Sequence, residues 1–207
     1  MKKLVLSLLF LFPAVLFAQE EEVKATFDSF KAAMVEGNTD AVLALTSASS
    51  MEYYSNMLDM VLYADSAKVA ALPLIQKIGV LGTRVRIPKE DLIGMDGESF
   101  FRYNIDNNKQ NSQQIQMLGI GDVMSVDDNT AQGQVTANGQ ALPMSINFVQ
   151  EGSDWKIDMS SLENMSEGQL NQIIQQSGMD FNQFLKMAMA QQGMEVDDSI
   201  WQPLAEK

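Results

Sequence analysis

Apolar residues in the first half of the chain recur every three or four positions, which is the spacing of helices with one buried face. The first predicted helix carries four such side chains, Val23, Phe27, Phe30 and Met34. Gly37 is placed to end this helix, because glycine readily adopts the left-handed conformation that follows many helices. The acidic run 20–22 lies at its amino end, where the helix dipole favours negative charge.

Two further helices are predicted before position 65. Asn38 or Thr39 can cap a short helix that continues to Leu45, and Ser49 or Ser50 can cap a longer one. The longer helix has an apolar side formed by Met51, Tyr54, Leu58, Val61 and Leu62. Asp65 then begins a new turn.

The segment after position 66 fits two structures. Pro73 suits the first turn of a helix, and the apolar residues that then keep a helical spacing are Leu74, Ile78, Leu81 and Val85. Alternatively, residues 84–87 alternate between polar and apolar, as in a strand that ends at Pro88. We expect the helix.

The next segment leads from helix to sheet. Pro88 starts a turn through Leu92, and Gly97 precedes a helix that contains Phe100, Phe101, Tyr103 and Ile105. The polar, amide-rich stretch from Asn107 to Gln114 predicts a loop.

From Ile115 to Leu162 the apolar period becomes two, which predicts an antiparallel meander. The residues that set this period on the third strand are Leu142, Met144, Ile146 and Phe148, and those on the last strand are Trp155, Ile157 and Met159. The pair Asn138-Gly139 predicts a type I′ hairpin turn, since both residues tolerate a positive φ. Small residues on the second strand suggest a bent or closely approached sheet.

After Leu162 the pattern is helical again. Ser166 and Asp180 are placed to cap two helices, and a last apolar cluster is formed by Ile200, Trp201 and Leu204. These helices can cover the outer face of the sheet, or dock a second subunit or another protein. The predicted fold class is therefore α+β, with N-terminal helices packed on a curved antiparallel β-meander and a C-terminal helical extension.

Residues 1–18 have the three parts of a secretory signal. Lys2 and Lys3 precede an apolar run from Leu4 to Phe17, and Ala18 lies at the expected cleavage boundary. The run is shorter than the ~20 residues of a spanning helix. Leu16 is larger than the residue usual at its position, so an uncleaved anchor is the alternative. We expect an exported protein, periplasmic or secreted, with an α+β domain over 19–162 and a helical extension over 163–207.

Composition excludes several classes of function. The 207 residues include no Cys and no His, which removes zinc fingers, His-dependent triads and disulfide scaffolds. No Cys follows the apolar run, so the bacterial lipoprotein route is excluded as well. Loss of Lys2 and Lys3 takes the formal charge from −13 to −15. Nucleic acid and anionic membrane surfaces are not expected as partners, because both require a positive surface, and no stable membrane insertion is expected after signal removal.

The order of elements resembles the nuclear transport factor 2-like superfamily of cone-shaped α+β domains. The resemblance is carried by the opening helix, the Gly37-Asn38 turn and a last strand that reads Asp154 to Asp158, and it covers residues 20–162. That family includes isomerases, dehydratases, hydrolases, immunity proteins and binding modules. The resemblance therefore implies a fold and no single function.

A ketosteroid-isomerase type of enzyme is the catalytic alternative. It needs a carboxylate base and a Tyr donor in one apolar cavity. The tyrosines are Tyr53, Tyr54, Tyr63 and Tyr103, and the carboxylates near apolar segments are Asp59, Asp122 and Asp158. No spacing pairs them, so an enzyme is the less favoured interpretation.

Arginine offers another candidate site. Arg84, Arg86 and Arg102 are the only arginines, and guanidinium groups bind carboxylates bidentately. On a helix Arg84 and Arg86 diverge, so salt bridges with Glu90, Asp91 or Glu98 are the commoner explanation. The candidate ligand-binding residues are Tyr54, Tyr103, Arg84, Arg86 and Trp155.

No metal or cofactor is expected. Met187, Met189 and Met194 could offer thioethers to Cu(I), but helical geometry separates them, and adaptable packing is the favoured role. The predicted function is non-catalytic binding, either of a small apolar ligand in the cone or of a protein through the C-terminal helices. A homo-oligomer is compatible with the sequence.

Overall fold

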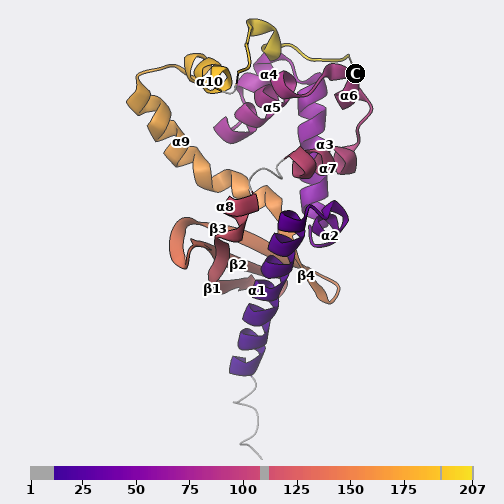
Figure 1. Cartoon of the computed structure of the whole chain (residues 1–207), viewed down its shortest axis with the longest axis vertical. Helices are drawn as coiled ribbons and strands as arrows, with labels where there is room; N and C mark the ends of the chain where they lie inside the picture. Colours follow the sequence, from indigo (N-terminus) through magenta and orange to yellow (C-terminus); the bar gives the residue numbers. More distant parts are fainter. Residues whose placement is uncertain (1–11, 108–111, 192, 207) are drawn as a thin grey trace, which may run out of the picture. The chain divides into compact units, whose positions relative to one another are not determined.

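The structure is a computed structural model that describes residues 12–107, 112–191 and 193–206 (Figure 1). The chain divides into two compact units. The sheet unit joins residues up to Ser47 to Ile105–Met159, and the helical unit joins Ala48–Asn104 to the residues from Ser160 onward. Both are described in turn, and together they confirm the α+β class.

The sheet unit begins with helix α1 (Phe12–Glu36), whose predicted apolar face is buried at Val23, Phe27 and Phe30. Gly37 ends the helix with φ 69°, as expected. The side chain of Asn38 then accepts a hydrogen bond from the Ala41 amide and caps α2 (Thr39–Ala44). These local signals in the sequence were therefore confirmed.

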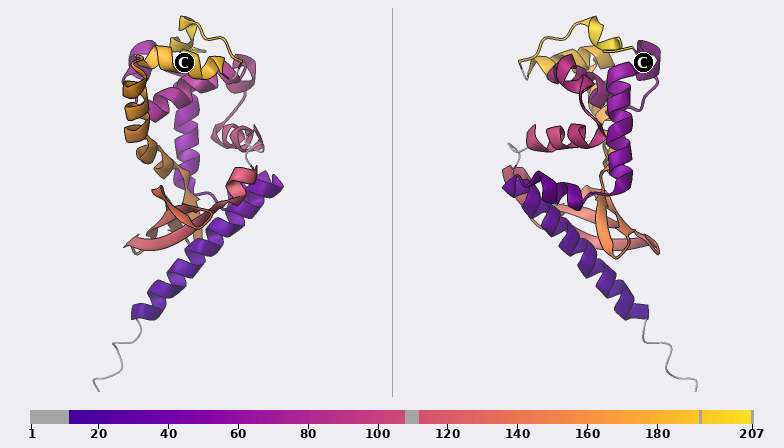
Figure 2. Two further views of the ribbon diagram at one scale, coloured as in Figure 1. Left: turned by 60° about the vertical axis from the view of Figure 1, so that its left-hand side comes forward. Right: turned by 90° about the vertical axis from the view of Figure 1, so that its right-hand side faces the viewer.

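Four antiparallel strands follow in the order β1-β2-β3-β4. They are β1 (Leu118–Asp127), β2 (Thr130–Ala137), β3 (Gln140–Glu151) and β4 (Asp154–Asp158). Asn138 and Gly139 have φ values of 51° and 77°, which confirms the predicted hairpin between β2 and β3. The sheet is open and curved, with α1 lying along it (Figure 2).

The buried face of the sheet packs against α1. Its fully or nearly buried side chains are Ala131, Val135, Ile146, Phe148, Trp155 and Ile157. A Cβ atom on Gly133 would lie 2.8 Å from Ile120 Cγ2 and 3.1 Å from Phe148 Cε2. Glycine at this position thus leaves room for the side chains of Ile120 and Phe148 from the neighbouring strands, which is the close approach that the small residues of β2 suggested.

Three boundaries in the sheet unit differ from the prediction. The first strand begins at Leu118 and not at Ile115, because Ser112–Gln116 forms a short helix, α8, that contacts α1. The expected loop from Asn107 to Gln114 is thus wrong at Ser112–Gln114; Asn107 ends α7, and 108–111 lie outside the described residues. Met159 starts the 3-10 helix η2 (Met159–Leu162) and does not extend β4.

The helical unit contains α3 (Ala48–Tyr63), α4 (Ser66–Ala70), α5 (Leu74–Arg86), α6 (Lys89–Ile93), most of α7 (Gly97–Asn107), α9 (Glu163–Ser177), α10 (Phe181–Ala190) and the 3-10 helix η3 (Asp198–Trp201). The boundary between the two units falls within α7, after Asn104. Residues 74–86 are helical, so the strand alternative is wrong. Asp180 and Gln183 form a capping box on α10, as Asp180 predicted. Ser49, Ser50 and Ser166 are not caps, because α3 begins at Ala48 and α9 at Glu163.

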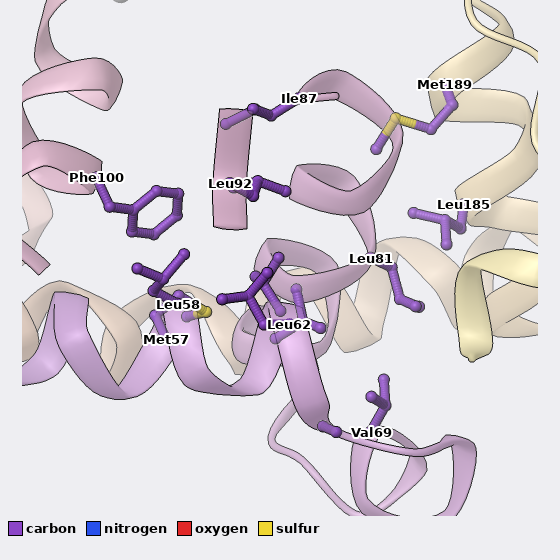
Figure 3. Close-up of a cluster of buried hydrophobic side chains, with 13 residues drawn as sticks. Met57, Leu58, Leu62, Val69, Leu81, Ile87, Leu92, Phe100, Leu185 and Met189 are labelled. Atoms are coloured by element: carbon purple, nitrogen blue, oxygen red, sulfur yellow. The ribbon is translucent and has the colours of Figure 1, made fainter. Parts of the chain in front are cut away.

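One apolar core joins the two sequence segments of the helical unit (Figure 3). Leu185 and Met189 of α10 are buried in it with residues of α3, α5 and α6, such as Leu62, Leu81 and Leu92. The last apolar cluster, Ile200, Trp201 and Leu204, packs against the same core. Helix α10 and the residues after it therefore bury apolar side chains on helices of their own unit.

In the part of the chain that the structure describes, no helix is both long enough and apolar enough to cross a membrane.

Candidate functional site

Arg84 of α5 is buried, with 7% of its surface exposed, and its guanidinium group donates to main-chain carbonyls. Nε donates to Val61 O at 2.8 Å, and Nη2 donates to Met60 O at 3.0 Å and Ala64 O at 2.6 Å. Nη1 donates to Ile200 O at 2.8 Å. The last carbonyls of a helix have no partner within the helix, so Arg84 supplies one for the end of α3.

The charge of Arg84 is retained at neutral pH. Burial lowers the pKa of Arg84 to about 10, which is still far above 7. Its donors face four main-chain carbonyl oxygens. Arg84 is therefore positioned to hold α3, α5 and η3 together and not to meet a ligand.

Of the other two arginines, Arg86 is exposed and Arg102 is half-buried. Arg86 points away from the buried side of α5, and its Nε donates to Gly82 O at 3.1 Å. Arg102 pairs with Glu98 at 2.9 Å, four positions earlier on α7. The expected divergence of Arg84 and Arg86 is thus observed, and of the acidic residues considered, Glu98 makes an ion pair with Arg102.

The candidate tyrosines lie beside the helical core. The ring of Tyr54 makes edge-to-face contacts with Tyr53, with centroids 5.4 Å apart, and with Phe101, with centroids 4.9 Å apart. Tyr103 is half-buried and packs on the same core. Their aromatic rings contribute to packing at the edge of this core.

The described acidic side chains, unlike these tyrosines, do not lie in apolar surroundings. Asp59 and Asp122 are exposed and Asp158 is half-buried, and none of the Asp and Glu side chains with described burial is buried. A carboxylate that acts as an acid–base catalyst in this type of enzyme depends on apolar surroundings. The described carboxylates also form no group of three or more that could hold a metal ion.

Trp155 lies in the sheet unit. It is 5% exposed on β4 and pairs with Gln150 of β3. Ile157, two positions later on the same face of β4, is fully buried. Trp155 is thus part of the core between the sheet and α1.

A surface groove that the sequence did not predict lies along α10. It has a volume of about 410 Å³ and is lined by Lys186, Ala190, Met194, Glu195, Val196 and Asp197. All six residues belong to the helical unit. We call this feature the α10 groove.

The end of α10 creates the groove by reversing the chain. The Gly193 amide donates to Ala190 O at 3.0 Å and the Met194 amide to Met189 O at 3.1 Å, with Gly193 at φ 76°. This double hydrogen bond is the Schellman arrangement. It returns residues 194–197 alongside the helix that they have just left.

Two polar contacts hold the segment that follows Val196. The carboxylate of Asp197 accepts from the Ser199 amide at 2.7 Å and caps η3. The hydrogen bond from the Ser199 side chain has the largest effect on the pKa of Asp197 and lowers it. The hydrogen bond from the Ser199 backbone lowers it further. Lys186 pairs with Asp198 at 3.0 Å, which ties the returning segment to α10.

The lining combines an apolar base with a charged rim. Ala190, Met194 and Val196 contribute apolar surface, and the exposed charged residues of the rim are Lys186, Glu195 and Asp197. Lys186 also pairs with Asp198 outside the groove, and the lining holds two carboxylates against this one ammonium group, so its net charge is negative. The sequence signal that could have located the groove is Gly193 followed by alternating apolar and acidic residues from Met194 to Asp197.

Comparisons with protein-family models, with curated proteins and with solved structures found no match to this chain.

Proposed function

We propose that this chain is an exported, non-catalytic binding protein, and that the α10 groove holds a small ligand with an apolar body and a positively charged group. The observation that carries the proposal is the lining of the groove, which joins apolar surface to an unbalanced negative rim. Its volume of about 410 Å³ falls within the ~300–1,000 Å³ typical of small-molecule sites.

The whole-chain charge favours the same class of ligand. With a formal charge of −13 for the full chain, and −15 once Lys2 and Lys3 are removed, the protein attracts cations and repels anions over distances longer than the groove itself. The earlier expectation placed a ligand in the cone of a nuclear transport factor 2-like fold. The buried positions of Phe148, Trp155 and Ile157 favour the α10 groove over that location.

Export and the family resemblance remain parts of the proposal. The basic, apolar and small-residue parts of 1–18 support export. The packing of α1 on a curved meander supports the resemblance.

A protein partner is the second candidate. Ile173 of α9 is 53% exposed and Met187 of α10 is 36% exposed, and both are large apolar side chains on the C-terminal helices. Native mass spectrometry of the purified protein distinguishes the candidates, since it reports a retained small molecule and the number of subunits together.

A fluorescence titration tests the groove directly. The Trp155→Phe variant leaves Trp201, three residues after the Asp198 that binds Lys186, as the only tryptophan. We expect octyltrimethylammonium to change its emission at a concentration at least tenfold lower than octyl sulfate does. Octyl glucoside, with the same alkyl chain and no charge, should fall between them.

A matched pair of variants locates the binding. Ala190→Phe fills the groove and should weaken octyltrimethylammonium binding about tenfold. Asn182→Phe adds the same ring to an exposed position of α10 outside the groove and should leave binding unchanged. Equal binding of the three surfactants, or equal behaviour of the two variants, would show that the α10 groove is not the site.

A further inference from the structure

Gln19 would become the first residue of the exported protein. This follows from cleavage after Ala18, so the inference rests on the export proposed above. In an N-terminal glutamine the free α-amino nitrogen and the side-chain carboxamide carbon can close a five-membered ring. No other standard residue with an uncharged side chain offers that ring.

The surroundings of Gln19 leave its amide without a stabilising role. The Nε2 atom is buried and has no hydrogen-bond partner, which is unusual because buried polar groups are nearly always paired. The residue lies within α1, in the same helical run as 12–18. Before cleavage, this amide therefore brings no hydrogen bond to the helix.

The charge at the new terminus is also unfavourable. After cleavage, α1 would begin near Gln19, and a protonated α-amine there would oppose the positive end of the helix dipole. The neighbouring Glu20 carboxylate pairs with Lys24 at 2.7 Å, so it is engaged by another cation. Glu21 and Glu22 are exposed and already suit the dipole without further change.

We infer that Gln19 is a modification site, and that the mature chain begins with its cyclic lactam, pyroglutamate. The α-amino nitrogen attacks the side-chain carboxamide carbon and forms a new C–N bond. The bond from that carbon to Nε2 breaks, and Nε2 leaves as ammonia after taking up the proton that the α-amine loses. The step needs no oxidant, reductant or co-substrate.

The product removes the unfavourable charge. The lactam has no ionisable amine, so the positive charge at the start of α1 is removed. The unpaired Nε2 donor leaves with the ammonia. The three glutamates 20–22 then lie in the first turn of a helix whose end is neutral.

Mass spectrometry of the full chain, produced with residues 1–18 in an exporting bacterial host, tests the inference. The mature protein should have the mass of residues 19–207 reduced by about 17 Da, the mass of ammonia. The tryptic peptide from Gln19 to Lys24 should carry the whole loss. The Gln19→Asn variant is the matched control, because an N-terminal asparagine would need a strained four-membered ring, and it should be cleaved without loss of ammonia.

Each remaining outcome has a distinct meaning. A chain that begins at unmodified Gln19, fresh and after storage at neutral pH, overturns cyclisation and leaves export supported. A chain that begins at Met1 overturns both proposals, and one that begins at another residue overturns cyclisation alone. As a second readout, the cyclised protein should unfold at a higher temperature than Gln19→Asn at neutral pH, and this difference should diminish at high salt.

Discussion

At the scale of single residues, Arg84 shows how a charge in an acidic protein is used for structure. Its guanidinium group reaches three carbonyls at the end of α3 and one in η3. A planar group with several fixed donors suits such a cluster of acceptors better than a point charge does. The role of Arg84 therefore depends on its geometry as well as on its charge.

Replacement of Arg84 should destabilise the helical unit strongly. Arg84→Met keeps much of the apolar stem but leaves the carbonyls without their donor, and we expect a loss of about 3 kcal/mol in the free energy of unfolding. Arg84→Lys should lose about half as much, because an ammonium group satisfies fewer of the acceptors. Urea unfolding measures both, with the exposed Arg86→Met as the control. A loss for Arg84→Met no larger than the control's would contradict this role.

Among the described glycines of the helical unit, Gly97 has the least space for a side chain. A Cβ atom there would lie 1.9 Å from Ser55 Oγ and 3.0 Å from Ser55 Cα, so α7 can begin against α3 only without a side chain. Gly97→Ala should lower the free energy of unfolding by about 1–3 kcal/mol. Gly94→Ala is the control, since its nearest contact is 3.9 Å away and its φ is −85°; it should be neutral or slightly stabilising. An equal free energy of unfolding for the two variants would show that α3 can move to accommodate the added methyl group without losing stability.

At the scale of elements, signals that act over a few residues were the most informative. Asn138-Gly139 placed the hairpin, and Asp180 placed the start of α10, because the turn and the cap are determined by neighbouring backbone atoms. Ile115 was assigned to a strand because its spacing from Met117 fits period two. In the structure Ile115 is half-buried on α8, which contacts α1. Packing against α1, which is far away in the sequence, determined α8. A pattern over a few neighbouring residues does not contain that contact.

Helix caps make stability depend on pH. Hydrogen bonds from Ser99 to the carboxylate of Asp96 lower the pKa of Asp96 from 3.8, the side-chain bond more than the backbone bond. Hydrogen bonds from Ser199 lower the pKa of Asp197 in the same way. The unfolded state then binds more protons than the folded state in the window just below pH 3.8 and above the lowered values. Stability should therefore rise with pH through that window and be lost as the pH falls through it.

The cap variants isolate this contribution. Asn also caps helices well but does not titrate, so Asp96→Asn with Asp197→Asn should lose less stability between pH 5 and pH 3 than the parent protein does. Urea midpoints at both values measure the difference. An identical loss in the parent and the double variant would exclude these two carboxylates as the cause.

At the scale of the whole molecule, the division into two units was hidden from the sequence. The helical unit is made of two segments, Ala48–Asn104 and the residues from Ser160 onward. Arg84 and Ile200 are 116 positions apart, and the Ala205 amide donates to Leu62 O at 2.9 Å. Periodicity gives the elements but not such pairings, which explains why Arg84 was considered for ligands or salt bridges. The α10 groove was missed for a related reason, because its lining depends on how the chain turns back after Gly193.

Each unit contains one tryptophan, which allows the two cores to be followed separately. Trp155 is buried in the sheet unit, and Trp201 packs on the helical core beside Phe181, with ring centroids 6.2 Å apart. The single-tryptophan variants Trp155→Phe and Trp201→Phe should therefore report the unfolding of the helical unit and of the sheet unit respectively. Since the hydrogen bonds of Arg84 lie within the helical unit, Arg84→Met should lower the urea midpoint seen by Trp201. The midpoint seen by Trp155 should change much less, because Trp155 and the buried side chains of β2, β3 and β4 belong to the sheet unit, and the hydrogen bonds of Arg84 do not. Equal shifts at both tryptophans would mean that the two units unfold as one cooperative structure.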